Sequence, residues 1–420
     1  MKKIIISLIL FTTITVHCKA SYILLPMDES QKNHLKSYGV TYKALEYQAE
    51  VWWLLNYRGG SFLLSFDKVI ERDCIIKGVS YEIIADAQKN LIFNEISSPS
   101  VNMDAVKLEK APQIAVYTPP YSQPWDDAVT LALTYAEIPY DKIYDNEIIN
   151  GLLSNYDWLH LHHEDFTGQY GRFYGAYGRA RWYVEQQLES ERNALALGYN
   201  KVSLLKLDVA KEIKRYVAEG GFLFAMCSAT DSFDIALSAE GVDICESMFD
   251  GDPADPNAQS KLDYSKCIAF TDFTLVTNPM IYEFSDIDVD ANIRKVGTKD
   301  DFFTLFEFSA KWDPVPTMLC QNHENLIRGF MGQTTAFKSK LIKPHVLIMG
   351  ENKALSEAKY IHSEHGKGMW TFYGGHDPED YRHYVGDEHT DLSLYPNSPG
   401  YRLILNNVLF PAAKKKKLKT

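Results

Sequence analysis

The chain has few cysteines, and they stand far apart. Six cysteines occur among 420 residues. Those beyond residue 20 are Cys74, Cys227, Cys245, Cys267 and Cys320. Their spacing excludes a CxxC metal knuckle, and their odd number leaves at least one thiol without a partner in the same chain. We therefore expect no disulfide scaffold, and a free thiol that is either buried or chemically used.

Basic side chains are in the minority. The sequence holds 43 lysines and arginines against 55 acidic residues, a formal net charge of −12. Nucleic-acid binding depends on basic patches, so this balance argues against a nucleic-acid partner. The one basic cluster, KKKKLKT, belongs to a tail at residues 412–420 that we interpret as a solvated chain end.

A long apolar run is confined to the start of the chain. Two lysines precede IIISLILFTTITV, and the small residue Ala20 follows. This order is typical of a signal peptide, and the run is shorter than the roughly 20 apolar residues that cross a membrane. We predict a signal peptide at residues 1–20, cleaved after Ala20, and an exported protein, periplasmic or extracellular, with no stable membrane span. A lipid anchor on Cys18 fits less well, because His17 precedes it where a small residue is expected.

The remaining sequence predicts an α/β protein. From Gln113 onward, strand-like segments such as IAVYTP alternate with helix-like segments such as WDDAVTLALTYAEIP. Such alternation is typical of a parallel sheet with helices on both faces. We predict a doubly wound, flavodoxin-like parallel sheet over residues 109–411. Residues 21–108 form a small N-terminal α/β subdomain, and the connection falls near 97–112.

Cys227 stands where a strand-like run meets a helix-like run. The segment GGFLFAMCSATDSFDIAL changes at this cysteine from an apolar strand pattern to a helical pattern. A thiol on such a turn lies at the carboxyl edge of the sheet and beside the positive end of a helix, which stabilises the thiolate. The alternative is that Cys227 is a small buried hydrophobic residue, as most free cysteines are.

A histidine follows a second strand-like run. His376 comes after MWTFY and a Gly-Gly turn, with Asp377 and Glu379 close behind. A thiol, an imidazole and a carboxylate are the groups that nucleophilic acyl chemistry requires. We predict Cys227 as nucleophile, His376 as base, Asp377 or Glu379 as the carboxylate that orients the base, and Ser228 as a substrate-binding residue.

Three histidines at the end of the strand-like run DWLHLHH support a different hypothesis. His160 and His162 would point to one face of the strand and His163 to the other, with Glu164 or Asp377 as a nearby acid. Such side chains can hold zinc with an open position for water, which would make the protein a metal-dependent hydrolase. Hydrogen-bonded imidazoles at a buried strand end explain the pattern equally well. Zinc is the one cofactor that the sequence suggests.

An insertion rich in aromatic residues and arginine, GQYGRFYGAYGRARWY, follows the histidines. Arg172 and Arg179 would bind a carboxylate or a sugar in a small-molecule substrate, and the aromatic rings would stack on it. The same side chains suit internal packing or a subunit contact. A non-catalytic binding protein is therefore a third hypothesis, and the oligomeric state stays unknown.

Residues 113–411 resemble the class I glutamine amidotransferase-like superfamily, and within it the trehalose-utilisation (ThuA-like) branch. The resemblance rests on NPMIYEFSDIDV, AKYIHSEHGKGMWTFYGGHDPEDY and SPGYRLILNNVLF, while AMCSA resembles the elbow of the DJ-1-like branch. It implies a hydrolase or amidotransferase-like protein acting on an amide or a sugar-derived small molecule through Cys227 and His376. The chain departs from glutaminases at Ala229, where they carry glycine, and it lacks their glycine-rich oxyanion loop.

The whole chain also resembles exported bacterial proteins that carry the label asparagine synthetase B. The segment SATDS at 228–232 echoes the pyrophosphate loop of true asparagine synthetases, but it is one residue shorter and lacks both glycines. Those enzymes also begin with a cysteine nucleophile, whereas the first residue after the predicted cleavage is Ser21. Asparagine synthesis is therefore not the activity that we expect.

Overall fold

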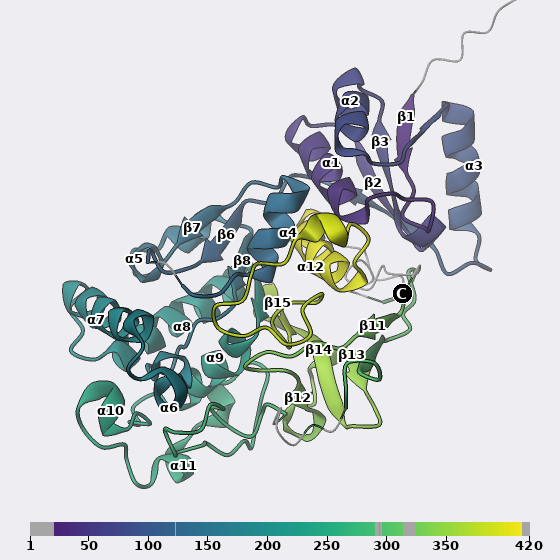
Figure 1. Cartoon of the computed structure of the whole chain (residues 1–420). Coiled ribbons are helices and arrows are strands. Elements are labelled where there is room, and N and C mark those ends of the chain that lie inside the picture. The colour runs from purple at the N-terminus through teal and green to yellow at the C-terminus, as the bar shows by residue number, and fades with distance from the viewer. Residues whose placement is uncertain (1–20, 122, 290–293, 295, 314–323, 414–420) are drawn as a thin grey trace, which may run out of the picture.

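The computed structural model describes residues 21–121, 123–289, 294, 296–313 and 324–413. The predicted signal peptide, Cys320 and most of the basic tail lie outside these residues. The described chain forms a five-stranded sheet near the N-terminus and a larger sheet of 10 strands (Figure 1). The prediction of an α/β protein is confirmed.

Residues 21–108 form an antiparallel sheet between helices. Its order is β4-β1-β3-β2-β5, and helices α1 and α3 pack on opposite faces. The segment predicted as a connection near 97–112 contains a strand of this sheet, β5, which pairs with β2. The elements are β1 (Tyr22–Leu25), α1 (His34–Glu46), β2 (Val51–Leu55), β3 (Ser61–Ser65), α2 (Lys68–Lys77), β4 (Glu82–Ile84), α3 (Asp86–Ser97) and β5 (Asp104–Leu108).

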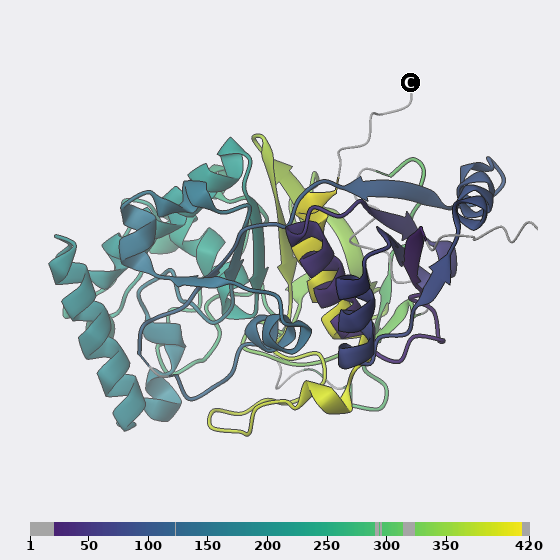
Figure 2. The same ribbon diagram turned by 90° about the horizontal axis from the view of Figure 1, so that it is seen from above.

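The N-terminal unit shares its hydrophobic core with the rest of the chain. Helix α1 packs against α4 (Ala128–Ala136) and α12 (Pro399–Leu409), and the three helices lie side by side in Figures 1 and 2. The fully buried Arg402 of α12 donates to the Tyr38 hydroxyl at 3.0 Å, to the Met27 carbonyl at 3.2 Å and to the Gly59 carbonyl. The N-terminal unit therefore packs directly against α4 and α12.

The large sheet is mixed, which corrects the prediction of a parallel sheet. Five strands are parallel, in the order β7 (Asp141–Ile143), β6 (Ile114–Tyr117), β8 (Trp158–Leu161), β9 (Phe222–Met226) and β15 (Gly368–Tyr373). Next to β15, the sheet continues in antiparallel fashion through β14 (Glu357–His365), β13 (Leu347–Asn352), β10 (Phe302–Leu305) and β11 (Leu326–Arg328), and β12 (Phe337–Lys338) pairs with β14. The cause is the two-residue turn between His365 and Gly368, because so short a connection can only join antiparallel strands.

The parallel strands are buried on both faces. Helices α1, α4 and α12 cover one face, and α8 (Val202–Glu219) and α9 (Ser228–Ser238) cover the other together with α5 (Asp145–Ile149). This burial explains why β6 and β9 are continuous apolar runs and why every residue of β8 is buried. The carboxyl ends of the five parallel strands meet at one edge of the sheet, where ligands of such folds bind.

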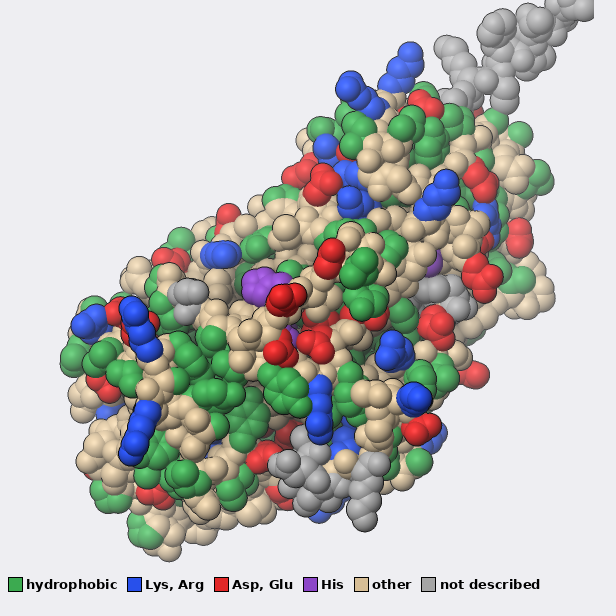
Figure 3. All heavy atoms as spheres, viewed as in Figure 1, with side chains coloured by type: hydrophobic (Ala, Val, Ile, Leu, Met, Phe, Trp, Pro, Cys, Tyr) green, Lys and Arg blue, Asp and Glu red, His purple; other side chains and the backbone are tan. Residues whose placement is uncertain are grey.

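The segments beyond this edge are mostly irregular. Their described residues include α7 (Arg181–Ala196), the short helices α6 (Tyr174–Tyr177), α10 (Ser247–Asp250) and α11 (Ala258–Lys261), and single turns of 3-10 helix. Lys and Arg side chains are scattered over the face in Figure 3. Among the described helices, none combines the length and the apolar character that a membrane span requires.

Candidate active site

Cys227 lies on the strand-to-helix turn that the sequence predicts. Strand β9 ends at Met226, and Cys227 is the residue from which α9 begins. Its backbone has φ +49° and ψ −138°, a conformation that residues other than glycine rarely adopt. Such strain is typical of functional residues whose side chain must be held in one direction. The Cys227 side chain lines a cavity of about 470 Å³.

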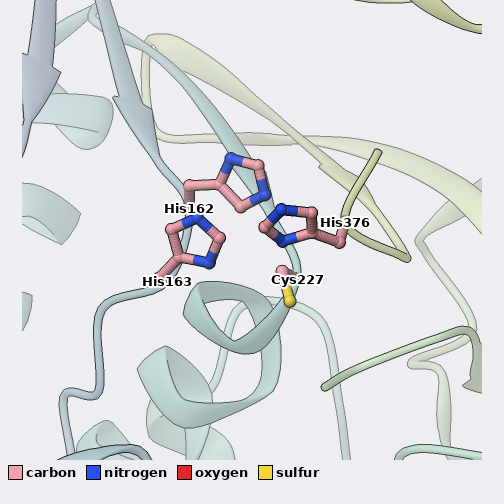
Figure 4. A group of neighbouring side chains, drawn as sticks. All are labelled: His162, His163, Cys227 and His376. Carbon is pink, nitrogen blue, oxygen red and sulfur yellow. The ribbon is translucent and has the colours of Figure 1, made fainter. Parts of the chain in front are cut away.

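His376 lies beside Cys227 and is held by Asp126. It follows β15, which pairs with β9, and its Nε2 lies 3.1 Å from Asp126 Oδ1. Figure 4 shows the other ring nitrogen, Nδ1, directed toward the Cys227 sulfur. Burial alone would lower the pKa of His376, but hydrogen bonds with Asp126 and Cys227 raise it to about 10. The imidazole is therefore charged at neutral pH, between a carboxylate and a thiol.

The carboxylate next to His376 is Asp126, and this corrects the prediction of Asp377 or Glu379. Asp377 is fully buried, and its Oδ1 accepts the Glu379 amide at 2.8 Å within a tight turn. The Glu379 carboxyl faces Ser398 at the start of α12 instead. Both acids thus stabilise the segment that follows His376. The acid that contacts the imidazole, Asp126, lies far away in the sequence.

Asp126 and Asp127 precede α4 and are the site residues that sequence reasoning missed. Asp127 caps this helix, because its Oδ1 accepts the amides of Val129 at 2.8 Å and Thr130 at 2.9 Å. The signal was present in the sequence, since an acidic pair follows the first strand of the parallel sheet and precedes a helix.

His160 is directed away from Cys227, into contacts that hold Asp127. The side chain is fully buried, with Nδ1 3.1 Å from the Phe224 carbonyl and Nε2 3.2 Å from Asp127 Oδ2. Both ring nitrogens of His160 are therefore already engaged. His160 thus supports the helix cap.

The side chains of His162 and His163 lie next to Cys227 and His376, as Figure 4 shows. The Nδ1 atom of His162 is 3.3 Å from Asp127 Oδ1, yet neither ring nitrogen makes a hydrogen bond with the described residues. His163 donates from Nε2 to the Asp126 carbonyl at 2.6 Å. Burial lowers the pKa of His162 to about 4 and that of His163 well below its usual value, so both rings are neutral.

Four candidate ligand atoms converge at this point. One atom each from His162, His163, His376 and the Cys227 thiol lie within 4.8 Å of one another. Glu164, the acid predicted beside the histidines, accepts the His162 amide at 2.9 Å and is outside this group. The structure therefore brings together two of the three predicted metal ligands, and it adds His376 and Cys227 in place of His160.

Of the residues predicted to bind substrate, Arg172 is used in internal packing. It lines the cavity, but its guanidinium holds the segment 276–281, which matches the packing alternative for this insertion. Arg179 is exposed and is not among the described residues that line the cavity. The partners of Arg172 are Gln169 Oε1 at 2.7 Å and the carbonyls of Val276 at 2.8 Å, Asn278 at 2.5 Å and Ile281 at 3.1 Å.

The SATDS segment, residues 228–232, is the buried start of α9 and not an open loop. Thr230 Oγ1 donates to the Cys227 carbonyl at 2.6 Å, and Ser232 Oγ donates to the Glu164 carbonyl at 3.0 Å. Ser228 is buried, and its hydroxyl has no hydrogen-bond partner among the described residues.

The cavity has an aromatic wall and a few charged groups. The indole of Trp125 stacks on Phe173 with ring centroids 5.1 Å apart. Asp288 is almost fully buried in the wall, and burial together with the Asp231 charge raises its pKa well above its usual value. Further lining residues are Tyr177, Tyr282, Tyr384, Glu283, Gln333 and Arg382.

Comparisons with known proteins leave the family open. No family model and no curated protein matches the chain. Among solved structures, the cytoplasmic protein STM3548 from Salmonella typhimurium aligns with 72% of this chain and 100% of its own, at 10% identity and a TM-score of 0.35. The cytoplasmic protein STM1381 from Salmonella typhimurium LT2 aligns with 72% of this chain and 99% of its own, at 11% identity and a TM-score of 0.34.

A third alignment is shorter. Gan42B, a GH42 beta-galactosidase from G. stearothermophilus, aligns with 63% of this chain but only 27% of its own, at 9% identity and a TM-score of 0.27. At these TM-scores none of the alignments identifies a function. The functional argument therefore rests on the site itself.

Proposed function

We propose that the protein is an exported hydrolase that cleaves an amide or ester bond of a small or sugar-derived molecule with Cys227 as nucleophile. The observation that carries the proposal is the strained turn at Cys227, which presents the thiol to a histidine held by a carboxylate. Thiol hydrolases need this combination of nucleophile, base and orienting acid.

The order of the parallel strands supports the finer assignment of the fold. The chain runs from β6 outward to β7, then back past β6 to β8, β9 and β15. This is the order of flavodoxin-like sheets, to which class I glutamine amidotransferase-like and ThuA-like proteins belong. The nucleophile of such a fold is expected at the carboxyl end of a central strand, and Cys227 directly follows β9.

The reaction follows from the positions of the three side chains. The Cys227 thiolate attacks the carbonyl carbon, and the electron pair of the carbonyl double bond moves to the oxygen. When this intermediate collapses, the leaving amine or alcohol takes a proton from His376 Nδ1, and a thioester remains on Cys227. Water then attacks the thioester, His376 takes the proton of the water, and the thiolate is released.

Two further groups serve this reaction. The Ser228 amide begins α9, where the helix dipole favours the negative oxygen of the intermediate. Asp126 fixes the ring of His376 through Nε2, which leaves Nδ1 for the thiol and the leaving group. The cavity of about 470 Å³ suits a small molecule, and its aromatic wall suits a planar or sugar-like surface.

The metal-dependent hydrolase built on His160, His162 and His163 is less well supported, because both ring nitrogens of His160 are engaged by the Phe224 carbonyl and by Asp127. The test is a panel of small amides, esters and glycosyl amides assayed with the purified protein and with Cys227→Ser. We expect hydrolysis by the wild type and loss of at least about 100-fold in the variant.

Cys74 is a matched control for this test, since it is buried in the N-terminal unit, far along the chain from the site. Cys74→Ser should keep full activity. Activity that survives in Cys227→Ser would contradict the proposal. Binding of a compound without turnover by the wild type would favour the non-catalytic binding protein.

A further inference from the structure

We propose that His162, His163, His376 and Cys227 form a binding site for Zn²⁺ at the floor of the cavity. One ligand atom from each side chain lies within 4.8 Å of the other three. In a tetrahedral zinc site with nitrogen and sulfur ligands, neighbouring ligand atoms are about 3.4–3.8 Å apart. A small contraction of the group, together with the rotation of one ring described below, would enclose the ion.

One nitrogen of each imidazole lies next to one of two consecutive acids, Asp126 and Asp127. His376 Nε2 contacts the Asp126 carboxylate at 3.1 Å, and His163 Nε2 donates to the Asp126 carbonyl at 2.6 Å. His162 Nδ1 faces the Asp127 carboxylate at 3.3 Å. In protein metal sites, ligating histidines are oriented in this way by a carboxylate or a carbonyl on the other ring nitrogen.

The buried nitrogens of His162 lack a partner that a metal would supply. The ring is 1% exposed, and neither of its nitrogens makes a hydrogen bond with the described residues. Buried polar atoms without a partner are rare because they cost free energy. Coordination of a metal by one of these nitrogens would remove this cost for that nitrogen.

Metal binding requires a rotation of one ring. The rings of His162 and His163 stack with centroids 3.9 Å apart and planes 15° from parallel, so their lone pairs do not yet meet at one point. His163 is fixed by its hydrogen bond to Asp126, whereas His162 has no hydrogen bond to break. Rotation of His162 about its Cβ–Cγ bond is therefore the step that completes the site.

The inference goes beyond the proposed function and concerns the same thiol. A thiolate that ligates Zn²⁺ is not free to attack a carbonyl carbon, so bound zinc would block the hydrolase. Only this inhibition rests on the proposed function. Metal binding itself is measured without substrate, and the two proposals can therefore fail separately.

The test uses Co²⁺ as a spectroscopic substitute for Zn²⁺ on the mature protein freed of metals with a chelator. We expect one Co²⁺ per chain, with the intense visible bands of tetrahedral coordination and a near-ultraviolet charge-transfer band from a thiolate ligand, all displaced by Zn²⁺. Cys227→Ser should lose the charge-transfer band and weaken binding at least about tenfold, and Asp126→Asn should weaken it about 10–100-fold.

Cys245 supplies the matched control. Its thiol lies beside Asp243 and Asp250, but Lys201 already binds these two carboxylates at 2.7 and 2.9 Å. Cys245→Ser should therefore leave the spectrum unchanged. Because a site variant can fail to fold, zinc protection of Cys227 from alkylation in the wild type is a second measurement. The proposal is overturned if the wild type shows no tetrahedral spectrum, if the thiolate band depends on Cys245, or if zinc leaves the alkylation of Cys227 unchanged.

Discussion

Asp126 Oδ1 lies 3.1 Å from Nε2 of His376, although one residue precedes the first helix on the large sheet and the other follows its last parallel strand. The fold brings them together because β6 and β15 both end at the same edge. Thr390 and His383 also approach the Asp126 carboxylate, at 3.2 and 3.5 Å. Burial would raise the pKa of Asp126, but these partners, led by His376, lower it.

Replacing Asp126 by Asn should impair the nucleophile without unfolding the protein. The amide keeps the shape of the side chain but removes the charge that stabilises the His376 imidazolium, so we expect the hydrolysis rate to fall about 100-fold or more. Glu379→Gln is the control, since the Glu379 carboxyl faces Ser398 and not the imidazole. A larger loss in Glu379→Gln than in Asp126→Asn would restore the assignment that the sequence alone suggested.

The pH dependence of stability should include a contribution from His362. Burial lowers the pKa of this histidine from 6.5 to about 3. The unfolded chain therefore takes up a proton below pH 6.5 while the folded chain does not, so stability is full above pH 6.5 and falls as the pH decreases toward 3. One such proton gives a slope of about 1.4 kcal/mol per pH unit.

Urea denaturation between pH 7 and pH 4 measures this slope. His362→Phe should reduce it by about 1.4 kcal/mol per pH unit, because phenylalanine fills the buried position without titrating, while His162 and His163 keep their own contributions. His345 is exposed, and His345→Gln should leave the slope as in the wild type. An unchanged slope in His362→Phe would mean that another group controls the acid sensitivity.

Loss of the Arg402 guanidinium should destabilise the whole chain. The side chain joins α12 to the N-terminal unit through Tyr38, Met27 and Gly59, and all of its contacts are buried. Arg402→Met removes the donor of these three buried hydrogen bonds, which we expect to cost about 2–5 kcal/mol in the free energy of unfolding. Arg181 is exposed on α7, and Arg181→Met should have no measurable effect. If the two variants were equally stable, Arg402 would not stabilise the contact between α12 and the N-terminal unit.

Export can be checked on the protein made in a cell that secretes it. The order of lysines, apolar run and small residue predicts cleavage after Ala20, so the intact mass should correspond to a chain that begins at Ser21. A mass that includes residues 1–20, or a lipid on Cys18, would contradict this prediction.

Local patterns in the sequence predicted the individual turns better than the contacts between them. The change from FLFAM to a helical pattern identified the turn at Cys227, where β9 ends and α9 begins. Such a turn depends on residues that are neighbours in the sequence. The carboxylate partner of His376 depends instead on which strands end side by side in the fold. The sequence alone therefore favoured the nearby Asp377 and Glu379 over the distant Asp126.

The antiparallel half of the large sheet was missed for a related reason. Strands β10, β11 and β13 are short and lie in a region with long irregular segments, so their pairing is decided by tertiary contacts.

Arg172 shows that the sequence also leaves the role of a single side chain open. An arginine among aromatic residues can bind a substrate or hold an internal loop, and the sequence does not distinguish these two roles. The structure does, because the Arg172 guanidinium donates to backbone carbonyls of segment 276–281.

The most direct test of the central claim is the alkylation of the native protein by iodoacetamide at neutral pH, mapped to individual cysteines. Burial raises the pKa of Cys74 to about 12 and raises those of Cys245 and Cys267 still further, so these thiols should react slowly. Cys227 lines the cavity beside a charged imidazole, and we expect it to react first, at least about tenfold faster than the other three, and to slow in Asp126→Asn. A Cys227 that stays unlabelled until the protein is denatured would show that the thiol is structural.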